Sequence, residues 1–388
     1  MNEYKVCGSG GVYIHVPYCR KRCIYCDFYS AGVVQADWRR LVDAFLTEFD
    51  MRKEECPEKT DTLYIGGGTP SLLPAKEFER LSTGLRQRLG DSDIKEFTIE
   101  VNPEDVTVDS IALWQAYGVN RISVGVQSFD NRLLHTVGRL HDGETARRAL
   151  RLLSSRCPNV SGDLIFGLPG QNVEGFCRDV REMLDMGVKH LSAYSLMYEE
   201  RTALTQLRND GRLREADEMD SVEMFSLLCR LTEAYGLKRY ELSNYALPGY
   251  ESQHNSLYWY GKPYLGLGPS AHSYDGKRTR RWNAGDIRMY LRTYTTSEPS
   301  PDLQDKLITR EILTDEELRE EEIMTRLRTT SGLDCYAYKL HWGEQAWKKL
   351  RYKVSRHVEA GNLCFKGNML SLTERGVMIS DEVIVDLF

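Results

Sequence analysis

The sequence predicts an α/β fold: a partial or closed barrel of six strand–helix units, followed by a small C-terminal α+β domain. Between residues 12 and 240, short runs rich in β-branched residues alternate with amphipathic stretches, and turns rich in glycine, proline and asparagine separate them. Strands that alternate with helices form βαβ units with parallel strands and right-handed crossovers. After residue 299 the pattern changes to helices and one short hairpin.

Each unit of the predicted barrel is a short strand followed by a helix. We place the strands at residues 12–16, 62–65, 97–101, 121–126, 160–166 and 190–196. The helices lie at residues 37–55, 75–89, 108–117, 143–155, 173–186 and 216–235. In barrels of this kind the chemistry lies at the C-terminal ends of the strands, so the residues just after each strand are the candidates for a site.

We divide the chain into three parts. Residues 1–245 form the barrel, residues 246–298 form an extension that carries the segment HNSLYW, and residues 299–388 form the C-terminal domain. Turn and helix-breaking residues cluster at 295–305, which is the predicted linker. Thr314 and the acids after it mark a helix start, and a hairpin turn follows at 366–368. Helices followed by a hairpin are typical of a winged-helix-like module.

The composition is that of a soluble globular chain. Of its 388 residues, 41% are hydrophobic and 28% are charged. The sequence contains no apolar run near the roughly 20 residues that cross a bilayer, and its first residues lack the order of a secretory signal. We therefore expect a cytoplasmic protein with reduced cysteines. The net charge of −6 argues against a nucleic-acid partner, which would need a clustered basic face.

Three cysteines follow the first predicted strand. Cys19, Cys23 and Cys26 have the spacing C-x3-C-x2-C in one loop. Thiolates select zinc, copper(I) or iron–sulfur clusters, and a structural zinc site usually recruits a second ligand pair, which the nearby sequence lacks. A [4Fe–4S] cluster normally takes four cysteines, so three would leave one iron open to a small molecule. A zinc knuckle or three unconnected thiols is the alternative.

Polar or glycine-rich turns follow the next four predicted strands. Glycines allow close approach of the backbone to a ligand, and a carboxylate at a barrel mouth can accept hydrogen bonds from a ribose. Flexible turns and solvated charges are the alternatives at each position taken alone. The turns contain Gly66, Gly67, Gly68, Thr69 and Pro70, then Glu100 and Asn102, then Gln127 and Arg139, and finally Asp163.

The cysteine loop, with Tyr25 before its third cysteine, resembles the signature of the radical S-adenosylmethionine (SAM) superfamily. The segments YIHVPYC, GGGTPS, EVNP, VGVQSF, DLIFGLPGQ and HNSLYW are together similar to one branch of it. That branch contains oxygen-independent coproporphyrinogen III dehydrogenase (oxidase) and the HemW-type haem chaperones. The resemblance covers most of the chain and implies a radical SAM barrel whose [4Fe–4S] cluster, held by Cys19, Cys23 and Cys26, chelates SAM at its open iron.

The resemblance also implies roles for residues at the strand ends. Tyr13, Gly67 and Glu100 would contact the SAM bound at the cluster. A second group would line the neighbouring SAM or substrate cavity, and its members are Tyr25, Gly68, Thr69, Gln127, Arg139 and Asp163.

Position 28 separates the two activities of this branch. The dehydrogenase extends its cysteine run to C-x3-C-x2-C-x-C, whereas this chain has Phe28 at the last position, and phenylalanine cannot ligate iron. The HemW-type branch lacks the dehydrogenase activity and carries haem to client proteins. Its HNxxYW motif is matched here by His254, Asn255, Tyr258 and Trp259, which implies haem binding by His254, since imidazole is a common haem ligand. A buried or capping histidine is the alternative.

The leading hypothesis is a haem-binding radical SAM protein that delivers haem to haem-requiring, including respiratory, proteins. The alternative is coproporphyrinogen III oxidase, which uses SAM for an oxidative decarboxylation, and whether the chain is an enzyme stays open. Expected cofactors are a [4Fe–4S] cluster and SAM, with haem as cargo. Expected partners are haem-accepting clients and an electron donor, and the resemblance leaves open a homodimer and a peripheral membrane contact through clients.

Overall fold

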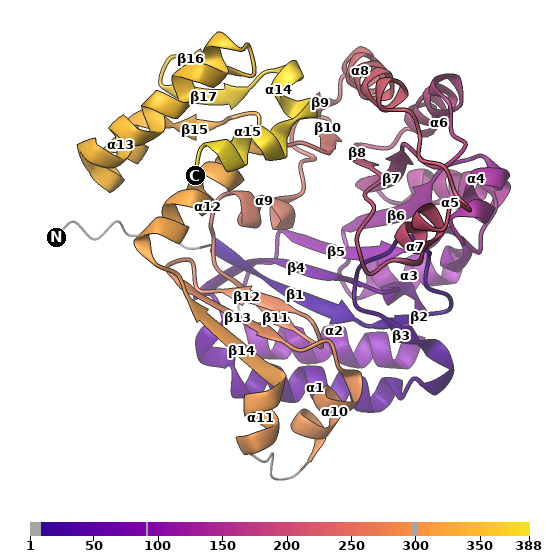
Figure 1. The fold of residues 1–388 in the computed structure, drawn as a ribbon. Coiled ribbons are helices and arrows are strands. Elements are labelled where there is room, and N and C mark those ends of the chain that lie inside the picture. The colour runs from indigo at the N-terminus through magenta and orange to yellow at the C-terminus, as the bar shows by residue number, and fades with distance from the viewer. Residues whose placement is uncertain (1–8, 91, 297–300) are drawn as a thin grey trace.

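The computed structural model describes residues 9–90, 92–296 and 301–388 (Figure 1). Six parallel strands occur in sequence order at the centre of one twelve-stranded sheet. They are β1 (Ser9–Val16), β4 (Lys59–Gly67), β5 (Glu96–Val101), β6 (Arg121–Gln127), β7 (Val160–Phe166) and β8 (His190–Ser195). The expected α/β architecture is confirmed, and the barrel is partial because the sheet ends in two edge strands.

The long helices of the barrel follow the strands as the sequence predicts. They are α1 (Trp38–Met51), α2 (Ala75–Leu89), α3 (Val108–Ala116), α5 (Gly143–Arg156), α6 (Val173–Asp185) and α8 (Glu218–Ala234). Side-chain caps set several of the starts, because an Asp, Asn or Thr oxygen accepts a free N–H of the first turn. The capping residues are Asp37, Thr107, Asp142, Asn172 and Asp217. Apolar side chains of these helices and of the strands share one buried core.

Short elements complete the barrel and its loops. The short helices are α4 (Asn131–Thr136), α7 (Ala203–Asn209), α9 (Gln253–Trp259), α10 (Ile287–Thr295) and α11 (Pro301–Leu307). The 3₁₀ turns are Val33–Gln35, Lys53–Glu55, Pro70–Leu72 and Pro103–Asp105. Two short strands, β2 (Tyr18–Cys19) and β3 (Ala31–Gly32), pair in parallel at the two ends of the cysteine loop.

The sheet extends beyond the six parallel strands on both sides, which the sequence analysis did not predict. Next to β8 lie β10 (Asn244–Ala246) and β9 (Lys238–Arg239). Next to β1 lie β11 (Tyr264–Leu267), β12 (His272–Tyr274), β13 (Thr279–Asn283) and β14 (Ile308–Ile312). Strands this short carry too little periodicity to be recognised in the sequence.

The C-terminal part contains helices and a small antiparallel sheet (Figure 1, orange to yellow). The strands are β15 (Leu333–Asp334), β16 (Leu363–Lys366) and β17 (Met369–Leu372), and the last two form the expected hairpin. The helices are α12 (Asp315–Leu327), α13 (Cys335–Glu359), α14 (Glu374–Met378) and α15 (Ser380–Asp386). Thr314 caps α12 through a capping box, as its sequence predicts.

The division of the chain at residues 245 and 298 stays a prediction. β14 lies beyond residue 299 and still pairs with β13, and positions 297–300 of the predicted linker lie outside the described residues. The nine cysteines in the described ranges are free thiols, and Cys7 lies outside those ranges. In the part of the chain that the structure covers, no helix combines the length and the apolar character needed to cross a membrane.

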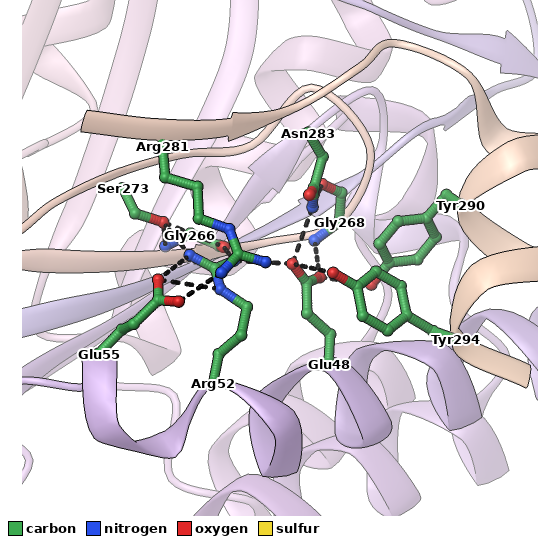
Figure 2. Close-up of polar contacts among 10 residues, drawn as sticks. All are labelled: Glu48, Arg52, Glu55, Gly266, Gly268, Ser273, Arg281, Asn283, Tyr290 and Tyr294. Carbon is green, nitrogen blue, oxygen red and sulfur yellow. Dashed lines mark hydrogen bonds and ion pairs between the residues drawn. The ribbon is translucent and has the colours of Figure 1, made fainter. Parts of the chain in front are cut away.

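A buried polar network joins the first helix of the barrel to the extension (Figure 2). The Glu48 side chain is completely buried on α1. One of its carboxylate oxygens accepts hydrogen bonds from Arg52 at 2.7 Å and Asn283 at 2.8 Å. The other accepts from the Gly268 N–H at 2.9 Å and the Tyr290 hydroxyl at 2.8 Å. Donors from four segments therefore converge on one carboxylate.

Arg52 extends this network to β11 and β12. Its guanidinium donates to the Gly266 carbonyl and the Ser273 hydroxyl, both at 2.8 Å. It also donates to Glu55 at 2.8 Å and 3.1 Å, and Glu55 in turn pairs with Arg281. The position of the extension beside β1 thus depends on Glu48 and Arg52, two buried charges that pair with each other, because an unpaired buried charge is costly.

We predict that Glu48→Ala lowers the free energy of unfolding by about 3–5 kcal/mol, because it leaves Arg52 and several buried donors without their acceptor. The measurement is chemical denaturation followed by circular dichroism. Glu54→Ala is the matched control, since the Glu54 side chain is 90% exposed and its ion pair is long, at 4.0 Å. Equal stabilities of the two variants would contradict the role assigned to the network.

Candidate functional site

A cavity of about 480 Å³ lies where the parallel strands end. We call it the cysteine cavity, because the cysteine loop forms one wall and the turns after β4 to β8 form the others. The predicted cluster and SAM residues line it, except Tyr13. Those that line it are Cys19, Cys23, Tyr25, Cys26, Gly67, Gly68, Thr69, Glu100, Gln127, Arg139 and Asp163.

Backbone contacts hold the cysteine loop over the cavity. The Cys26 N–H donates to the Cys23 carbonyl at 3.2 Å, and the Ile24 N–H donates to the Val137 carbonyl at 3.2 Å. The three cysteines are half-buried. Within the described ranges, no three Cys, His, Asp or Glu side chains converge closely enough to hold a single metal ion. The three sulfurs instead face a cavity of small-molecule size.

Two side chains contact the cysteine sulfurs, one just after β4 and one in the turn between α4 and α5. The Thr69 hydroxyl donates to Cys19 Sγ at 3.4 Å, and the Arg139 guanidinium donates to Cys23 Sγ at 3.7 Å. Burial raises the pKa of the Cys19 and Cys26 thiols, while the Thr69 hydrogen bond lowers the pKa of Cys19. Metal binding at these sulfurs would therefore release protons, because thiolates are the ligands.

Arg139 also fixes the geometry of the neighbouring turns. Its second terminal nitrogen donates to Asn102 Oδ1 at 2.8 Å and to the Gly125 carbonyl at 2.7 Å. One side chain thus connects the cysteine loop with the ends of β5 and β6. Its Nε is buried and has no partner among the described residues, so it is a donor that a ligand in the cavity can satisfy.

The glycines after β4 are required by close packing. Gly67 has a φ of 109°, a conformation that favours glycine. A Cβ on Gly68 would lie 2.8 Å from the Tyr18 carbonyl oxygen and 3.0 Å from Cys19 Sγ. The Gly68 N–H also donates to the Val16 carbonyl at 2.7 Å. The turn therefore passes directly beneath the start of the cysteine loop, where a side chain would displace it.

Two carboxyl groups face the cavity from β5 and β7, the strands on either side of β6. Burial raises the pKa of Glu100 to about 7 and that of Asp163 to about 6. Glu100 accepts hydrogen bonds from the Tyr64 hydroxyl at 2.7 Å and the Gly67 N–H at 3.1 Å. The Ser123 hydroxyl donates to both oxygens of Asp163, at 3.2 and 3.3 Å. These groups supply acceptors for ligand hydroxyl or amino groups.

Gln127 adopts a strained backbone conformation at the end of β6. Its φ is 68°, which is uncommon for a residue other than glycine. The pairing of β6 with β7 shifts its register between Gly125 and Gln127. Irregularities of this kind re-aim a side chain and cluster at functional sites. Here the irregularity places Gln127 in the wall of the cysteine cavity.

His254 lies outside the cysteine cavity, on α9. Its side chain is fully buried, and burial lowers its pKa to about 3. One ring nitrogen is 2.7 Å from the Thr62 hydroxyl and the other is 3.0 Å from the Tyr258 hydroxyl. Both nitrogens therefore have partners, and neither is free to bind iron in this conformation. Iron ligation by His254 stays a prediction.

The other members of the motif have different surroundings. Asn255, Tyr258 and Trp259 are half-buried, and the indole N–H of Trp259 is buried without a partner in the described part of the chain. Tyr258 and Tyr13 both line a separate cavity next to the cysteine cavity. The contact of Tyr13 with SAM also stays a prediction.

The sequence analysis missed part of the cavity wall. Tyr194, Ser195, Leu196 and Met197, at and just after the end of β8, line the cysteine cavity, and so does Ser123 on β6. The rule that sites form at strand ends applies to β8 as well. Applied to the sixth strand, it would have identified Tyr194 and its neighbours.

The fold and the cysteine site define a radical SAM protein. The model of the Radical SAM superfamily matches residues 13–183, and the model of the HemN C-terminal domain matches residues 313–379. Coproporphyrinogen III oxidase (HemN) from Escherichia coli, a radical SAM enzyme, has a similar fold, with a TM-score of 0.82 at 20% identity over 98% of this chain and 90% of that one. Membership of the superfamily implies a [4Fe–4S] cluster and SAM.

Curated relatives narrow the class to one family. The chain is 35% identical to the heme chaperone HemW of Lactococcus lactis, over 88% of this chain and 89% of that protein. It is 32% identical to the heme chaperone HemW of Bacillus subtilis, over 96% and 97% of the two chains. The E. coli relative of the same name is 37% identical over 76% of each chain. The chain belongs to the HemW family of the radical SAM superfamily.

We predict that Gly68→Ala reduces the iron and sulfide content after anaerobic reconstitution at least about twofold, because its Cβ meets backbone oxygens and Cys19 Sγ at or below 3.0 Å. A clash of this kind forces the surrounding structure to shift. Gly32→Ala is the matched control, since Gly32 pairs with Cys19 but has open space around it and a φ of −68°. Full cluster loading of Gly68→Ala would contradict the packing argument.

Proposed function

We propose that this protein binds haem and delivers it to haem-requiring proteins, respiratory ones among them, on a radical SAM scaffold. The single observation that carries the proposal is its likeness, over nearly the full length, to relatives named heme chaperones. The cysteine cavity and the adjoining aromatic residues provide places for a cluster, SAM and a flat apolar ligand. Client proteins and an electron donor complete the proposed set of partners.

The residues of the cysteine cavity fit a cluster with one open iron. Three half-buried thiols face the cavity, and no fourth cysteine lines it among the described residues. When bound, the cluster would supply an electron to the sulfonium of SAM. Glu100 would accept hydrogen bonds from SAM, and the unpaired Nε of Arg139 would donate to a carboxylate. Gly67 and Gly68 would let the ligand approach the backbone.

Phe28 supports the chaperone over the oxidase. Its side chain is 68% exposed and lines the cysteine cavity two residues after Cys26. A phenyl ring offers no ligand to iron at this position. It offers a flat apolar surface at the mouth of the cavity, where a porphyrin can pack.

We also propose a cytoplasmic location. The support is the free state of the nine described cysteines, which suits a reducing compartment. A homodimer and a membrane contact through clients belong to the same proposal and rest on the family resemblance alone.

We predict that replacing Cys19, Cys23 or Cys26 with Ser abolishes the brown chromophore of the anaerobically reconstituted protein and removes SAM binding. Removing one of three ligands leaves too few thiolates for the cluster. Cys364→Ser is the control, because Cys364 lies on β16 in the C-terminal part. Iron content, absorbance and equilibrium dialysis with SAM are the measurements. A colourless zinc protein from wild type would contradict the cluster.

A second experiment separates the chaperone from the enzyme. The reconstituted wild type is given SAM, reductant and coproporphyrinogen III, and a parallel sample is titrated with haem. We expect haem binding with a Soret change, transfer to an apo-cytochrome, and no protoporphyrinogen. Turnover of coproporphyrinogen III would overturn the proposed function in favour of the oxidase.

A further inference from the structure

A second cavity, of about 410 Å³, adjoins the cysteine cavity. Its volume is within the roughly 300–1,000 Å³ of small-molecule sites. We call it the aromatic cavity, and it is lined by Tyr13, His15, Asp27, Phe28, Tyr29, Tyr258, Tyr264, Ser270 and His272. These residues come from β1, the end of the cysteine loop, α9 and the β11–β12 segment.

Phe28 lines both cavities. In the aromatic cavity, the rings of Tyr13, Tyr258 and Tyr264 form much of the wall. The rings of Tyr258 and Tyr264 pack edge to face, with centroids 4.8 Å apart. Flat aromatic walls favour a flat aromatic ligand, and a ligand here would lie one side chain away from the cysteine cavity.

Several polar groups of the aromatic cavity are already used within the protein. The ring nitrogens of His15 are 3.1 Å from the Tyr13 hydroxyl and 2.9 Å from the Tyr29 carbonyl. The Tyr258 hydroxyl is paired with His254, and the Tyr29 hydroxyl accepts the Ile287 N–H at 2.8 Å. These groups would have to break existing hydrogen bonds to bind a ligand.

His272 differs from the other histidines and from most of the tyrosines of this cavity. Its side chain is exposed, and neither ring nitrogen has a hydrogen-bond partner among the described residues. Its ring stacks on Trp282, with centroids 5.4 Å apart and planes inclined by 16°. The stacking fixes the orientation of the imidazole on β12, which lowers the entropy cost of binding a ligand.

Among the described residues, the side chains of Asp27, Ser270 and Tyr264 in this cavity also have polar atoms without a hydrogen-bond partner. Of these, Tyr264 is the one to compare with His272, because tyrosine and histidine are both known haem ligands. A phenol ligates haem iron as the phenolate, and burial raises the pKa of the Tyr264 hydroxyl above its usual value. The imidazole of His272 needs no deprotonation, because its neutral form has a free lone pair. Between the two, the imidazole is the better iron ligand at neutral pH.

We propose that the aromatic cavity holds the haem and that His272 is the axial ligand of its iron. This inference rests on the proposed haem-binding function and adds the position of the cargo and the residue that binds it. The haem then lies beside Phe28, next to the cysteine cavity. The imidazole lone pair forms one bond to iron, with no change of oxidation state.

His254 takes the part of a positioning residue in this arrangement. Its ring nitrogen bonds the hydroxyl of Tyr258, and the Tyr258 ring forms part of the cavity wall. Thr62 on β4 holds the opposite nitrogen. The HNSLYW segment therefore contributes to the haem site through Tyr258, while His254 stays buried.

The test is an anaerobic haem titration of the full-length reconstituted protein, read by Soret absorbance and resonance Raman. We expect His272→Ala to shift the Soret band and weaken haem affinity at least about tenfold, and added imidazole to restore the wild-type spectrum. His272→Gln, which is closer in size, should show the same loss. His341→Ala is the control and should bind haem as wild type does, because His341 is also an exposed histidine stacked on a tryptophan but lies on α13, outside the cavity. Tyr264→Phe tests the phenol as the rival ligand. Far-UV circular dichroism and iron content report folding.

The outcomes are distinct. Wild-type affinity and spectrum in His272→Ala would overturn the ligand assignment while leaving haem binding intact. Loss of the Soret signature in Tyr264→Phe or His254→Ala, with His272→Ala unaffected, would assign the ligand elsewhere and overturn it too. Failure of the wild type to bind haem would overturn the proposed function itself and with it this inference.

Discussion

The guanidinium of Arg139 is the contact on which the geometry of the site depends. It joins a cysteine sulfur to the ends of two neighbouring strands, through Cys23, Asn102 and the Gly125 carbonyl. The pairing of β2 with β3, the Ile24 N–H bond to the Val137 carbonyl and the Thr69 bond to Cys19 Sγ also hold the cysteine loop. Arg139 differs from these contacts because one side chain reaches three segments. A planar group with five donors in fixed directions can hold three partners at once, which an ammonium group does less well.

The sheet places two cavities with different linings next to each other, the cysteine cavity and the aromatic cavity. Parallel strands bring their carboxyl ends to one edge, where Glu100, Gln127 and Asp163 surround the cysteines. Beyond β1, the added strands β11 and β12 bring aromatic and imidazole groups to the neighbouring cavity. The buried charges of Glu48 and Arg52 hold this extension against the barrel (Figure 2). Phe28 lines both cavities, so the residue at the position of the last cysteine of the dehydrogenase pattern also contributes to the second cavity.

Local patterns in the sequence predicted the barrel and most of the cysteine cavity. Cys19, Cys23 and Cys26 were found from their spacing, Glu100 from its position near the end of a predicted strand, and Asp163 from the segment DLIFGLPGQ that it begins. All of these are local signals. His272 had no companion motif, because its relation to Tyr258 and Phe28 arises only when β12 joins the sheet. The burial of His254 likewise depends on Thr62, which is 192 residues away in the chain. Contacts between residues so far apart in the chain produce no periodic pattern in the sequence, so sequence analysis cannot predict them.

The central claim is an iron–sulfur cluster held by three cysteines with one iron free to bind SAM. Electron paramagnetic resonance of the reduced, reconstituted protein tests it most directly, with spectra recorded before and after SAM is added. The account predicts a [4Fe–4S] signal whose g-values change on addition of SAM, because SAM replaces a ligand at the open iron. A signal that SAM leaves unchanged, or the absence of any cluster signal, would contradict it.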